Sequence, residues 1–493
     1  MLRRTLVRTA AVGALVALVS SCSQSTNHHS ASTPPSHKTV QADASPTGTA
    51  RPLPPDFFGL NGANFIRGTN PTDPRFVASL RALRPESIRV FGGTTANYWD
   101  WRTGSLLTTV ALPKDLATLP PAGMTLDRWK AMLDAAGATP IFDLNVVSST
   151  LSDQLAMLHA AQSMGMPVQR VELGNELYQS AHAVVDRYPS PTSYAQTAAQ
   201  WSAAIKAAFP GVQISVVGAL AQQGQPTPRK NAWNAAIATK SADYDAVTLH
   251  LYFPSGAGST QSIDEQEAAK VISNTRDRLR RFDDVDLAGV PAGKTCWVSE
   301  YNLLDRNSLV PGSWLHGLVV AQTSIALASQ PKVGMAVMHA IVGNAALAAI
   351  FGGGDTASTP SGSTPTTAKP KKGFAASQRT GEPYALTAAG DAMALVFAAS
   401  RDASSAQALG FGRDSDLVGI VFTAGSTRRL LVANLGAAPA QVQLGDLVAG
   451  GYHVQELSAA PGVFVSGPSA VRSRRLTGKG PLLVDPWSLS VVE

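Results

Sequence analysis

Short apolar runs alternate with longer helical patterns through most of the chain. Eight runs have the length and apolar content of buried strands, at residues 57–63, 87–93, 140–146, 168–176, 213–219, 245–253, 295–302 and 334–342. Stretches with helical spacing lie between them, at 73–83, 125–136, 150–163, 193–208, 262–282 and 314–329. Eight strand–helix units predict an α/β fold, a (β/α)8 TIM barrel over residues 55–400. A doubly wound open sheet is the alternative, which the lack of a glycine-rich phosphate loop after the first strand disfavours.

The pattern changes after the helix-like run 384–400. Apolar segments within 401–493 are short and bounded by Gly, Pro or Asp, which is typical of antiparallel strands. We therefore expect a C-terminal antiparallel β-sandwich domain over 401–493. A low-complexity stretch, 352–373, interrupts the predicted barrel, and its Gly, Ser, Thr and Pro content predicts a flexible surface loop.

The N-terminus has the pattern of an export signal. A basic start is followed by an apolar run too short to cross a bilayer, and Val-Ser-Ser precedes Cys22. We interpret residues 1–21 as a signal peptide and Cys22 as a lipidation site, because the junction resembles a bacterial lipobox. Residues 22–37 are then a lipidated polar tether, and we expect anchoring to the outer face of the bacterial cell membrane. The alternative is an ordinary signal peptide with a chance cysteine.

Charge and cysteine content exclude several function classes. The formal charge is +6, but removal of Arg3, Arg4 and Arg8 with the signal leaves 37 basic and 34 acidic residues, or +3. That balance is no signature of nucleic-acid binding. The chain has two cysteines, so lipidation of Cys22 leaves Cys296 unpaired and no disulfide framework is available. We expect Cys296 to act as a small buried hydrophobic residue.

Polar residues gather where the predicted strands end, which in a (β/α)8 barrel is the catalytic face. They are Asn61, Arg89, Asn145, Asn175, Glu176, His250, Tyr252, Glu300 and His339. The carboxylates Glu176 and Glu300 end the fourth and the seventh strand, so they would face each other across one barrel mouth. Asn175 beside Glu176 is hard to explain by packing, because a strand favours Val, Ile or Tyr.

Two facing carboxylates are what glycoside hydrolysis requires. One protonates the leaving oxygen and the other attacks the anomeric carbon or activates water, and a separation of about 5–5.5 Å predicts retention. The nucleophile must stay ionised, and Arg89 and Tyr252 are candidate hydrogen-bond donors to Glu300. A Glu at a strand end is also found in helix caps and in surface salt bridges, so each carboxylate has a structural alternative.

The other candidates have structural alternatives as well. His250 and Tyr252 share one strand face and would equally form a hydrogen-bonded core pair, and His339 is either a site residue or a satisfied core histidine. Trp99 and Trp101 either stack on a sugar ring or fill the top of the barrel. The sequence has no Cys/His metal spacing and no Gly-x-Ser-x-Gly nucleophile elbow, so we expect neither a metal nor a cofactor.

Three segments are similar to motifs of a known group of enzymes. Glu-Leu-Gly-Asn-Glu at 172–176 and Trp-Val-Ser-Glu at 297–300 resemble the catalytic segments of clan A of the retaining glycoside hydrolases. Ile-Arg-Val-Phe-Gly-Gly-Thr at 88–94 resembles the Arg-x-Gly-Gly-Thr segment of heparanase-like enzymes. The chain is thus similar to the heparanase and β-glucuronidase family over most of 38–493.

The resemblance implies roles for individual residues. Glu176 would be the acid/base, Glu300 the nucleophile, and Asn175 a partner of the sugar 2-hydroxyl. Tyr252 would orient Glu300. The family also pairs its barrel with a β-sandwich to which an N-terminal strand returns, and residues 38–54 resemble that strand. The remaining substrate-binding candidates are Arg89, His250, Asn145, Trp99 and His339.

Two other functions stay open at this point. Arabinofuranosidases and xylosidases of the same clan carry similar motifs. The aromatic run 97–101 resembles arabinofuranosidases as much as it resembles heparanase-like enzymes. A carbohydrate-binding lipoprotein on a decayed barrel is the non-enzymatic alternative, disfavoured because Glu176, Glu300 and Asn175 are all present. We expect a monomer that acts on an oligo- or polysaccharide. The basic clusters 276–281 and 472–475 either meet an anionic polymer or, as we prefer, are solvated surface charge.

Overall fold

The computed structural model describes residues 37–493 apart from 64–68, 108, 118–122, 222–225, 259–261, 306–307, 354–378, 413–414 and 449. The predicted signal peptide, the lipidation site Cys22, residues 22–36 of the tether and most of the predicted loop 352–373 lie outside the described residues. All elements below belong to the unit Lys38–Glu493. Within the described ranges, no helix is both long and apolar enough to cross a membrane.

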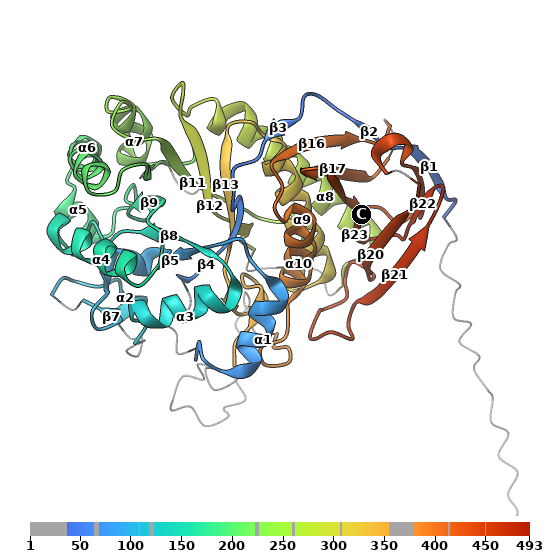
Figure 1. Ribbon diagram of the computed structural model, residues 1–493, viewed down its shortest axis with the longest axis horizontal. Helices are drawn as coiled ribbons and strands as arrows, with labels where there is room; N and C mark the ends of the chain where they lie inside the picture. The colour runs from blue at the N-terminus through green and yellow to red at the C-terminus, as the bar shows by residue number, and fades with distance from the viewer. Residues whose placement is uncertain are drawn as a thin grey trace, which may run out of the picture. The chain divides into compact units, whose positions relative to one another are not determined.

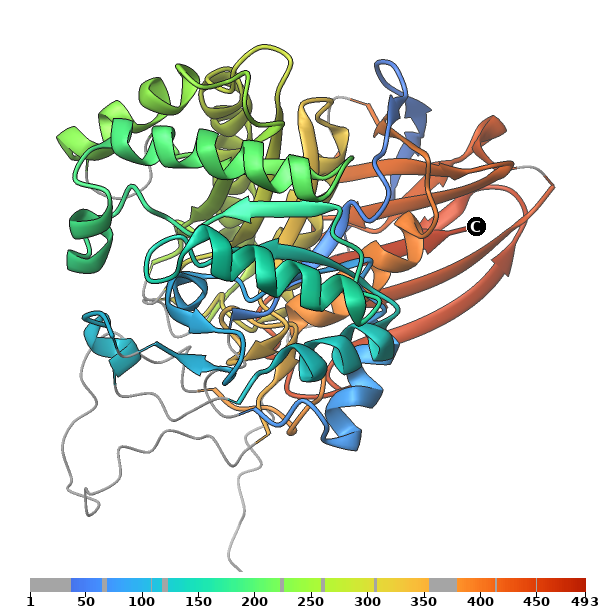
Figure 2. The ribbon, with the colours of Figure 1, turned by 60° about the vertical axis from the view of Figure 1, so that its left-hand side comes forward.

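Eight parallel strands form a closed barrel, in which the last strand pairs with the first. They are β4 (Phe58–Asn61), β5 (Ser87–Val90), β8 (Thr139–Asp143), β9 (Arg170–Leu173), β10 (Gln213–Val217), β11 (Ala246–Phe253), β12 (Thr295–Leu303) and β13 (Val333–His339). Each coincides with one of the eight predicted runs, so the predicted TIM barrel is confirmed and the open-sheet alternative is excluded. Figures 1 and 2 show these strands surrounded by helices.

The helices around the barrel include the six that the pattern predicted. The long ones are α1 (Pro74–Leu83), α3 (Leu126–Ala136), α4 (Leu151–Ser163), α6 (Pro191–Ala208), α7 (Pro228–Ala238), α8 (Glu265–Arg281), α9 (Trp314–Ser329) and α10 (Ala388–Ser400). Short elements in the connections are η2 (Thr94–Tyr98), β6 (Trp99–Asp100), β7 (Ser105–Leu106), α2 (Lys114–Ala117), α5 (His182–Arg187), η3 (Phe282–Leu287), β14 (Val342–Gly343) and β15 (Ile350–Phe351). The pattern did not predict α7, which buries only Trp233 and Ile237.

Helix α8 illustrates why these segments are helical. The Asp264 side chain caps its first turn by accepting from the backbone N–H of Glu267. Its first turn carries two glutamates and its last turn three arginines, a charge order that complements the helix dipole. One apolar face is buried, at Ala268, Val271, Ile272, Thr275 and Leu279.

The C-terminal residues form the predicted antiparallel β-domain. Its larger sheet has the order β2-β16-β17-β18-β23-β20-β21, with β3 also paired to β16, and its smaller sheet has the order β1-β19-β22. These elements are β1 (Val40–Asp43), β2 (Ser45–Pro46), β3 (Arg51–Pro52), β16 (Ser405–Gly410), β17 (Leu417–Ala424), β18 (Thr427–Asn434), β19 (Ala440–Gln443), η4 (Gly445–Leu447), β20 (Tyr452–Ser458), β21 (Arg472–Gly478), β22 (Leu482–Val484) and β23 (Ser488–Val492). Apolar side chains from both sheets share one core, for example Val432 and Val442.

The chain enters the β-domain before it enters the barrel. β1 pairs in parallel with β19, and β2 and β3 pair antiparallel with β16. Residues more than 350 positions apart, such as Val40 and Ala440, are therefore hydrogen-bonded neighbours. The first strand of the barrel follows within a few residues of β3.

Helices α9 and α10 lie between the barrel and the β-domain (Figure 1). Nearly every residue of α9 is buried, because the helix contacts β12 and β13 on one side and β16, β17 and β18 on the other. The indole N–H of Trp314 donates to the carbonyl of Trp487 at 2.6 Å, and the Ser400 hydroxyl donates to Glu86 at 2.6 Å. Cys296 is buried with a free thiol in β12, as predicted.

Candidate active site

Strands β11 and β12 carry the first part of the site. Their parallel register shifts by one residue between Thr248 and His250, so that His250 is the partner of Glu300. Such a bulge adds a residue to one strand and redirects the side chains beyond it. The shift brings the polar end of β11, His250 and Tyr252, beside the Glu300 carboxylate on the inside of the barrel.

The Glu300 carboxylate is almost completely buried and is held by three hydrogen-bond donors. Its Oε1 accepts from Arg89 Nη1 at 2.8 Å and from Asn61 Nδ2 at 2.9 Å. Its Oε2 accepts from the Tyr252 hydroxyl at 2.7 Å. The predicted donors Arg89 and Tyr252 therefore both contact Glu300, and Asn61, which the sequence placed at a strand end without a role, is a third.

Two imidazoles complete the surroundings of Glu300. The Nδ1 atoms of His250 and His339 lie 3.7 Å and 3.6 Å from Glu300 Oε2. Burial alone would raise the pKa of Glu300, but the charges of the two histidines and Arg89, with the Tyr252 hydrogen bond, hold it well below the ordinary value. The site is therefore built to keep this carboxylate ionised.

Glu176 stands in a different environment at the end of β9. It has a positive φ of 48°, which is uncommon for a residue with a side chain. The preceding Gly174 has φ 90°, and a Cβ there would lie 2.6 Å from Val146 Cγ2 and 2.9 Å from Leu177 Cδ1. The tight turn therefore needs glycine, and it directs Glu176 toward the barrel mouth.

The Glu176 carboxylate is partly exposed and has neutral donors around it. The Tyr178 hydroxyl donates to its Oε1 at 3.0 Å, and the Gln179 amide donates to its Oε2. His250 Nδ1 lies 3.0 Å from Oε1. The Glu176 side chain is 17% exposed against 6% for Glu300, so it is the more accessible of the two carboxylates.

His250 connects the two carboxylates. Because the same Nδ1 atom lies 3.0 Å from Glu176 Oε1 and 3.7 Å from Glu300 Oε2, these oxygens are at most 6.7 Å apart. Burial would lower the pKa of His250, but the charge of Glu300 and the hydrogen bond to Glu176 raise it. Its Nε2 lies 3.3 Å from the Ser299 hydroxyl, so both ring nitrogens have polar partners.

Arg89 holds a cluster of acidic groups beneath the site. Its fully buried guanidinium contacts Glu172 Oε2 at 2.6 Å, Asp143 Oδ2 at 2.9 Å and Glu300 Oε1 at 2.8 Å. It also donates to Asn175 Oδ1 at 3.2 Å. Three carboxylates thus share one cation, and burial raises the pKa of Asp143 to about 8 against the pull of Arg89.

Asn97 and Arg89 hold Asn175 in place by hydrogen bonds and leave its side-chain nitrogen available. Asn97 accepts from its backbone N–H at 3.1 Å and donates to its carbonyl at 2.8 Å. Its side-chain oxygen is occupied by Arg89. Its side-chain nitrogen has no hydrogen-bond acceptor in the described part of the chain, so it is available to a ligand.

Three of the predicted substrate-binding residues are buried and contact other parts of the protein. Arg89 is inaccessible, so it can position Glu300 but cannot touch a substrate. Asn145 is also buried, and its amide donates to the Trp99 carbonyl and to Ser148. Trp99 is buried, stacks on Phe91 with ring centroids 5.0 Å apart and donates to the Met124 carbonyl, which favours the packing alternative.

His339 is not a satisfied core histidine. Its Nδ1 is buried without a hydrogen-bond partner and faces Glu300, while its ring meets Tyr252 edge to face at 6.1 Å. Burial lowers the pKa of His339 although the charge of Glu300 opposes this. The peptide bond after His339 is cis, and its carbonyl accepts from Asn302 at 2.5 Å.

Sequence reasoning missed several residues of the site. They are Asn97, Asp143, Glu172, Tyr178, Gln179 and Ser299. A signal existed for Asp143 and Glu172, because Asp143 lies two residues before Asn145 and Glu172 four residues before Glu176, spacings that strand alternation assigns to one face. In the described ranges no three His, Cys, Asp or Glu residues are grouped so as to hold a metal ion.

Comparison with known proteins identifies the architecture. No protein-family model matches the sequence, and no curated protein matches it significantly. A family 51 α-L-arabinofuranosidase from Bifidobacterium longum is 16% identical with a TM-score of 0.69, and a GH51 α-L-arabinofuranosidase from Thermotoga petrophila RKU-1 is 17% identical with a TM-score of 0.65. In both cases 92% of this chain and 99% of the other are covered.

A third solved structure differs in its substrate. The 4-O-α-L-rhamnosyl-β-D-glucuronidase from Fusarium oxysporum 12S is 13% identical with a TM-score of 0.60, over 92% of this chain and all of the other. At such identities the likeness concerns the fold. The chain has the barrel and the C-terminal β-domain of these glycoside hydrolases.

Proposed function

We propose that this protein is a glycoside hydrolase that acts by double displacement with retention at the anomeric carbon. The observation that carries this proposal is the pair Glu176 and Glu300, whose nearest measured oxygens are no more than 6.7 Å apart across His250. Retaining enzymes need carboxyl groups about 5–5.5 Å apart, and inverting enzymes about 6.5–9.5 Å. The upper limit in this site lies near the bottom of the inverting range, which favours retention.

Glu300 is the nucleophile in this proposal. Its Oε1 already accepts from Arg89 and Asn61, whereas Oε2 has one strong donor, Tyr252, and keeps a lone pair. Oε2 attacks the anomeric carbon as the bond to the leaving oxygen breaks. An ester between the sugar and Glu300 results, and water later cleaves it.

Glu176 is the general acid and then the general base. It transfers its proton to the leaving oxygen in the first step and accepts a proton from the attacking water in the second, so it ends each cycle in its starting state. Its partial exposure at the barrel mouth suits exchange with a leaving group and with water. Asn175, with its free amide nitrogen, would donate to the sugar 2-hydroxyl, a hydrogen bond that strengthens in the transition state.

Two sugar specificities follow as proposals. The α-L-arabinofuranosidases with the same architecture support release of arabinofuranosyl units. The heparanase-like segment at 88–94 and the glucuronidase of the same architecture support a β-glucuronide or a related anionic glycan. Either sugar is compatible with the proposed reaction. The residues of the barrel-mouth loops would decide which one is cleaved.

We also propose that the protein works outside the cell on a lipid anchor. The lipobox-like Val-Ser-Ser-Cys22 and the polar segment that follows it support this. Replacement of Cys22 by Ala should move the protein from the membrane fraction to the soluble fraction. Unchanged retention in the membrane fraction would contradict the proposal.

A trapping experiment tests the reaction. Nitrophenyl α-L-arabinofuranoside, β-D-xyloside and β-D-glucuronide are compared first, and the anomer released first from the best substrate is identified by NMR. An activated 2-deoxy-2-fluoro derivative of that sugar should then label Glu300, as detected by peptide mass spectrometry, and should leave the Glu300→Gln variant unlabelled. Inversion of the product, or a label on another residue, would refute the mechanism. A protein that binds sugars but cleaves none would be the decayed-barrel alternative.

A further inference from the structure

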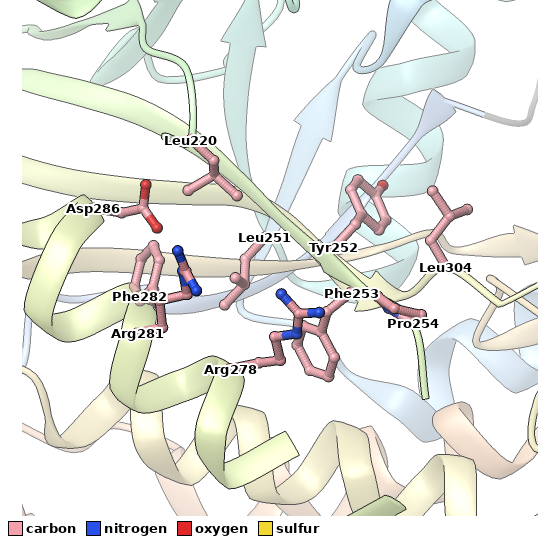
Figure 3. Close-up of a pocket in the computed structure, with 10 residues that line it drawn as sticks. All are labelled: Leu220, Leu251, Tyr252, Phe253, Pro254, Arg278, Arg281, Phe282, Asp286 and Leu304. Atoms are coloured by element: carbon pink, nitrogen blue, oxygen red, sulfur yellow. The ribbon is translucent and has the colours of Figure 1, made fainter. Parts of the chain in front are cut away.

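A cavity of about 230 Å³ lies on the outer side of the barrel wall, between β11 and α8. Figure 3 shows the side chains of Arg278 and Arg281 on α8, directed toward the strand that carries Leu251 and Phe253. Strand alternation places these two apolar residues on the outside, whereas Tyr252 between them reaches Glu300 inside. The cavity is therefore separated from the candidate active site by one strand.

The two arginines at this cavity differ from their neighbours on the same helix. Arg276 pairs with Asp416 at 3.7 Å, and the Arg280 guanidinium pairs with Asp277. Within the described ranges, Arg278 and Arg281 form no ion pair within 4.0 Å. The unpaired guanidinium groups of α8 are thus the two that line the cavity.

The rest of the lining is mainly apolar, with one carboxylate. Leu251, Phe253 and Phe282 are buried beneath the cavity, and Leu304 provides exposed apolar surface. Asp286 stands near Arg281 and accepts from the backbone N–H of Ala221 at 2.7 Å. Two guanidinium groups and one carboxylate leave the cavity with an excess of one positive charge, which fits a ligand with a single negative charge.

We propose that this cavity is an accessory binding site for a sugar unit that carries a carboxylate. The carboxylate would pair with Arg278 and Arg281, since a guanidinium fork matches a carboxylate in two parallel hydrogen bonds. The apolar face of the sugar ring would lie against the exposed side chain of Leu304. The proposal rests on the proposed function in that it names uronate-bearing glycans as the substrate class.

The position of the cavity connects it to the reaction. Its lining includes Tyr252, a donor to Glu300, and Leu304, a residue 44% exposed that directly follows β12. A chain that extends beyond the barrel mouth over Leu304 would bring a distant sugar unit to α8. Binding there would raise the affinity for long acidic glycans without altering the reacting groups.

The test compares two variants of α8. Arg278 and Arg281 are both changed to Ala in one, and Arg280 is changed to Ala in the matched control, which loses an arginine of the same helix that does not line the cavity. Binding of a galacturonate hexasaccharide, of a glucuronate-substituted xylohexaose and of their carboxyl-reduced forms is measured by calorimetry, at low and at high salt. Thermal unfolding checks that all proteins are folded.

We expect the double variant to weaken binding of both acidic oligosaccharides about tenfold or more, and the Arg280 variant to stay within about twofold of wild type. Added salt should weaken the wild type and scarcely affect the double variant. Equal binding by the double variant, equal binding of the carboxyl-reduced forms, or no binding by the wild type would overturn the proposal. If acidic oligosaccharides bind as expected but no glycoside is cleaved, this site stands and the proposed hydrolase function fails.

Discussion

Glu300 and Glu176 both contact His250, with carboxylate oxygens at most 6.7 Å apart, but they lie in opposite surroundings. Glu300 has one guanidinium, one amide and one phenol as donors, and almost no exposed surface. Glu176 sits on a left-handed turn, with a phenol and an amide as donors and an open side toward the mouth. The difference shows how one barrel can favour the ionised form of one carboxylate while it leaves the other accessible from the mouth.

The largest expected effect is the loss of the nucleophile. Glu300→Gln preserves size and hydrogen-bond capacity but cannot form the ester, so kcat should fall by about 10⁴-fold or more. Steady-state kinetics on the best nitrophenyl glycoside measures the loss, and circular dichroism checks the fold. Activity within tenfold of the wild type would remove Glu300 from this role.

Glu176→Gln should give a smaller and more selective loss. Poor leaving groups need protonation and should react about 10²- to 10⁴-fold more slowly, whereas nitrophenolate leaves without it. Hydrolysis of an alkyl and a 2,4-dinitrophenyl glycoside of the same sugar separates these cases. Equal losses on the two substrates would contradict the assignment of Glu176 as the general acid.

The contrast between the carboxylates was predictable from the sequence only in outline. The eight strands and most helices follow from apolar runs and helical spacing, because burial imposes these periods on the sequence. The two glutamates followed from their strand-end positions. Their environments did not, since the positive φ of Glu176 and the one-residue shift opposite Glu300 are properties of the folded backbone.

Three residues predicted to bind substrate make buried contacts instead, and the reason is common to them. Arg89 and Asn145 lie near strand ends and Trp99 lies in the connection after β5, but each side chain contacts a neighbour instead: Glu172, Ser148 and Phe91. Position along a strand predicts the end of the barrel on which a residue lies. Accessibility to a substrate depends on the loops above it, which no periodic pattern describes.

Glu172 and Asp143 share Arg89 beneath Glu300, and we expect their neutralisation to change the free energy of unfolding by different amounts. Glu172→Gln removes a charge from a buried pair and should lower the free energy of unfolding by about 3–5 kcal/mol. Asp143→Asn should leave it unchanged or raise it near neutral pH, because Asn matches the neutral carboxyl of the folded state, whose pKa is raised to about 8, and removes the ionisation that favours the unfolded chain. Urea denaturation of both variants at several pH values measures the difference.

The raised pKa of Asp143 also predicts how the stability of the wild type changes with pH. An unfolded Asp ionises near pH 4, whereas folded Asp143 keeps its proton to about pH 8, so the folded state binds more protons in this window. The wild type should therefore lose stability as pH rises from about 4 to about 8, at no more than about 1.4 kcal/mol per pH unit from this group. Asp143→Asn should lack that component. Parallel pH curves for the wild type and the variant would mean that Asp143 is ionised.

The smallest expected effect concerns His250, which faces both carboxylates. Its raised pKa favours the cation, and the Nε2–H of that cation needs the buried Ser299 hydroxyl as acceptor. Ser299→Ala should lower the pKa of His250 and reduce kcat/KM about threefold to tenfold, with the larger loss at higher pH because the cation is lost earlier.

Ser215→Ala is the matched control for this change. The Ser215 hydroxyl is equally buried in the barrel, but its partner is Thr248 at 2.7 Å and it does not touch the site. Both variants should lose similar stability, yet only Ser299→Ala should change the pH profile of kcat/KM. If the two profiles coincide, Ser299 serves packing alone, and the charge of His250 is set by Glu176 and Glu300 without help from the far side of the ring.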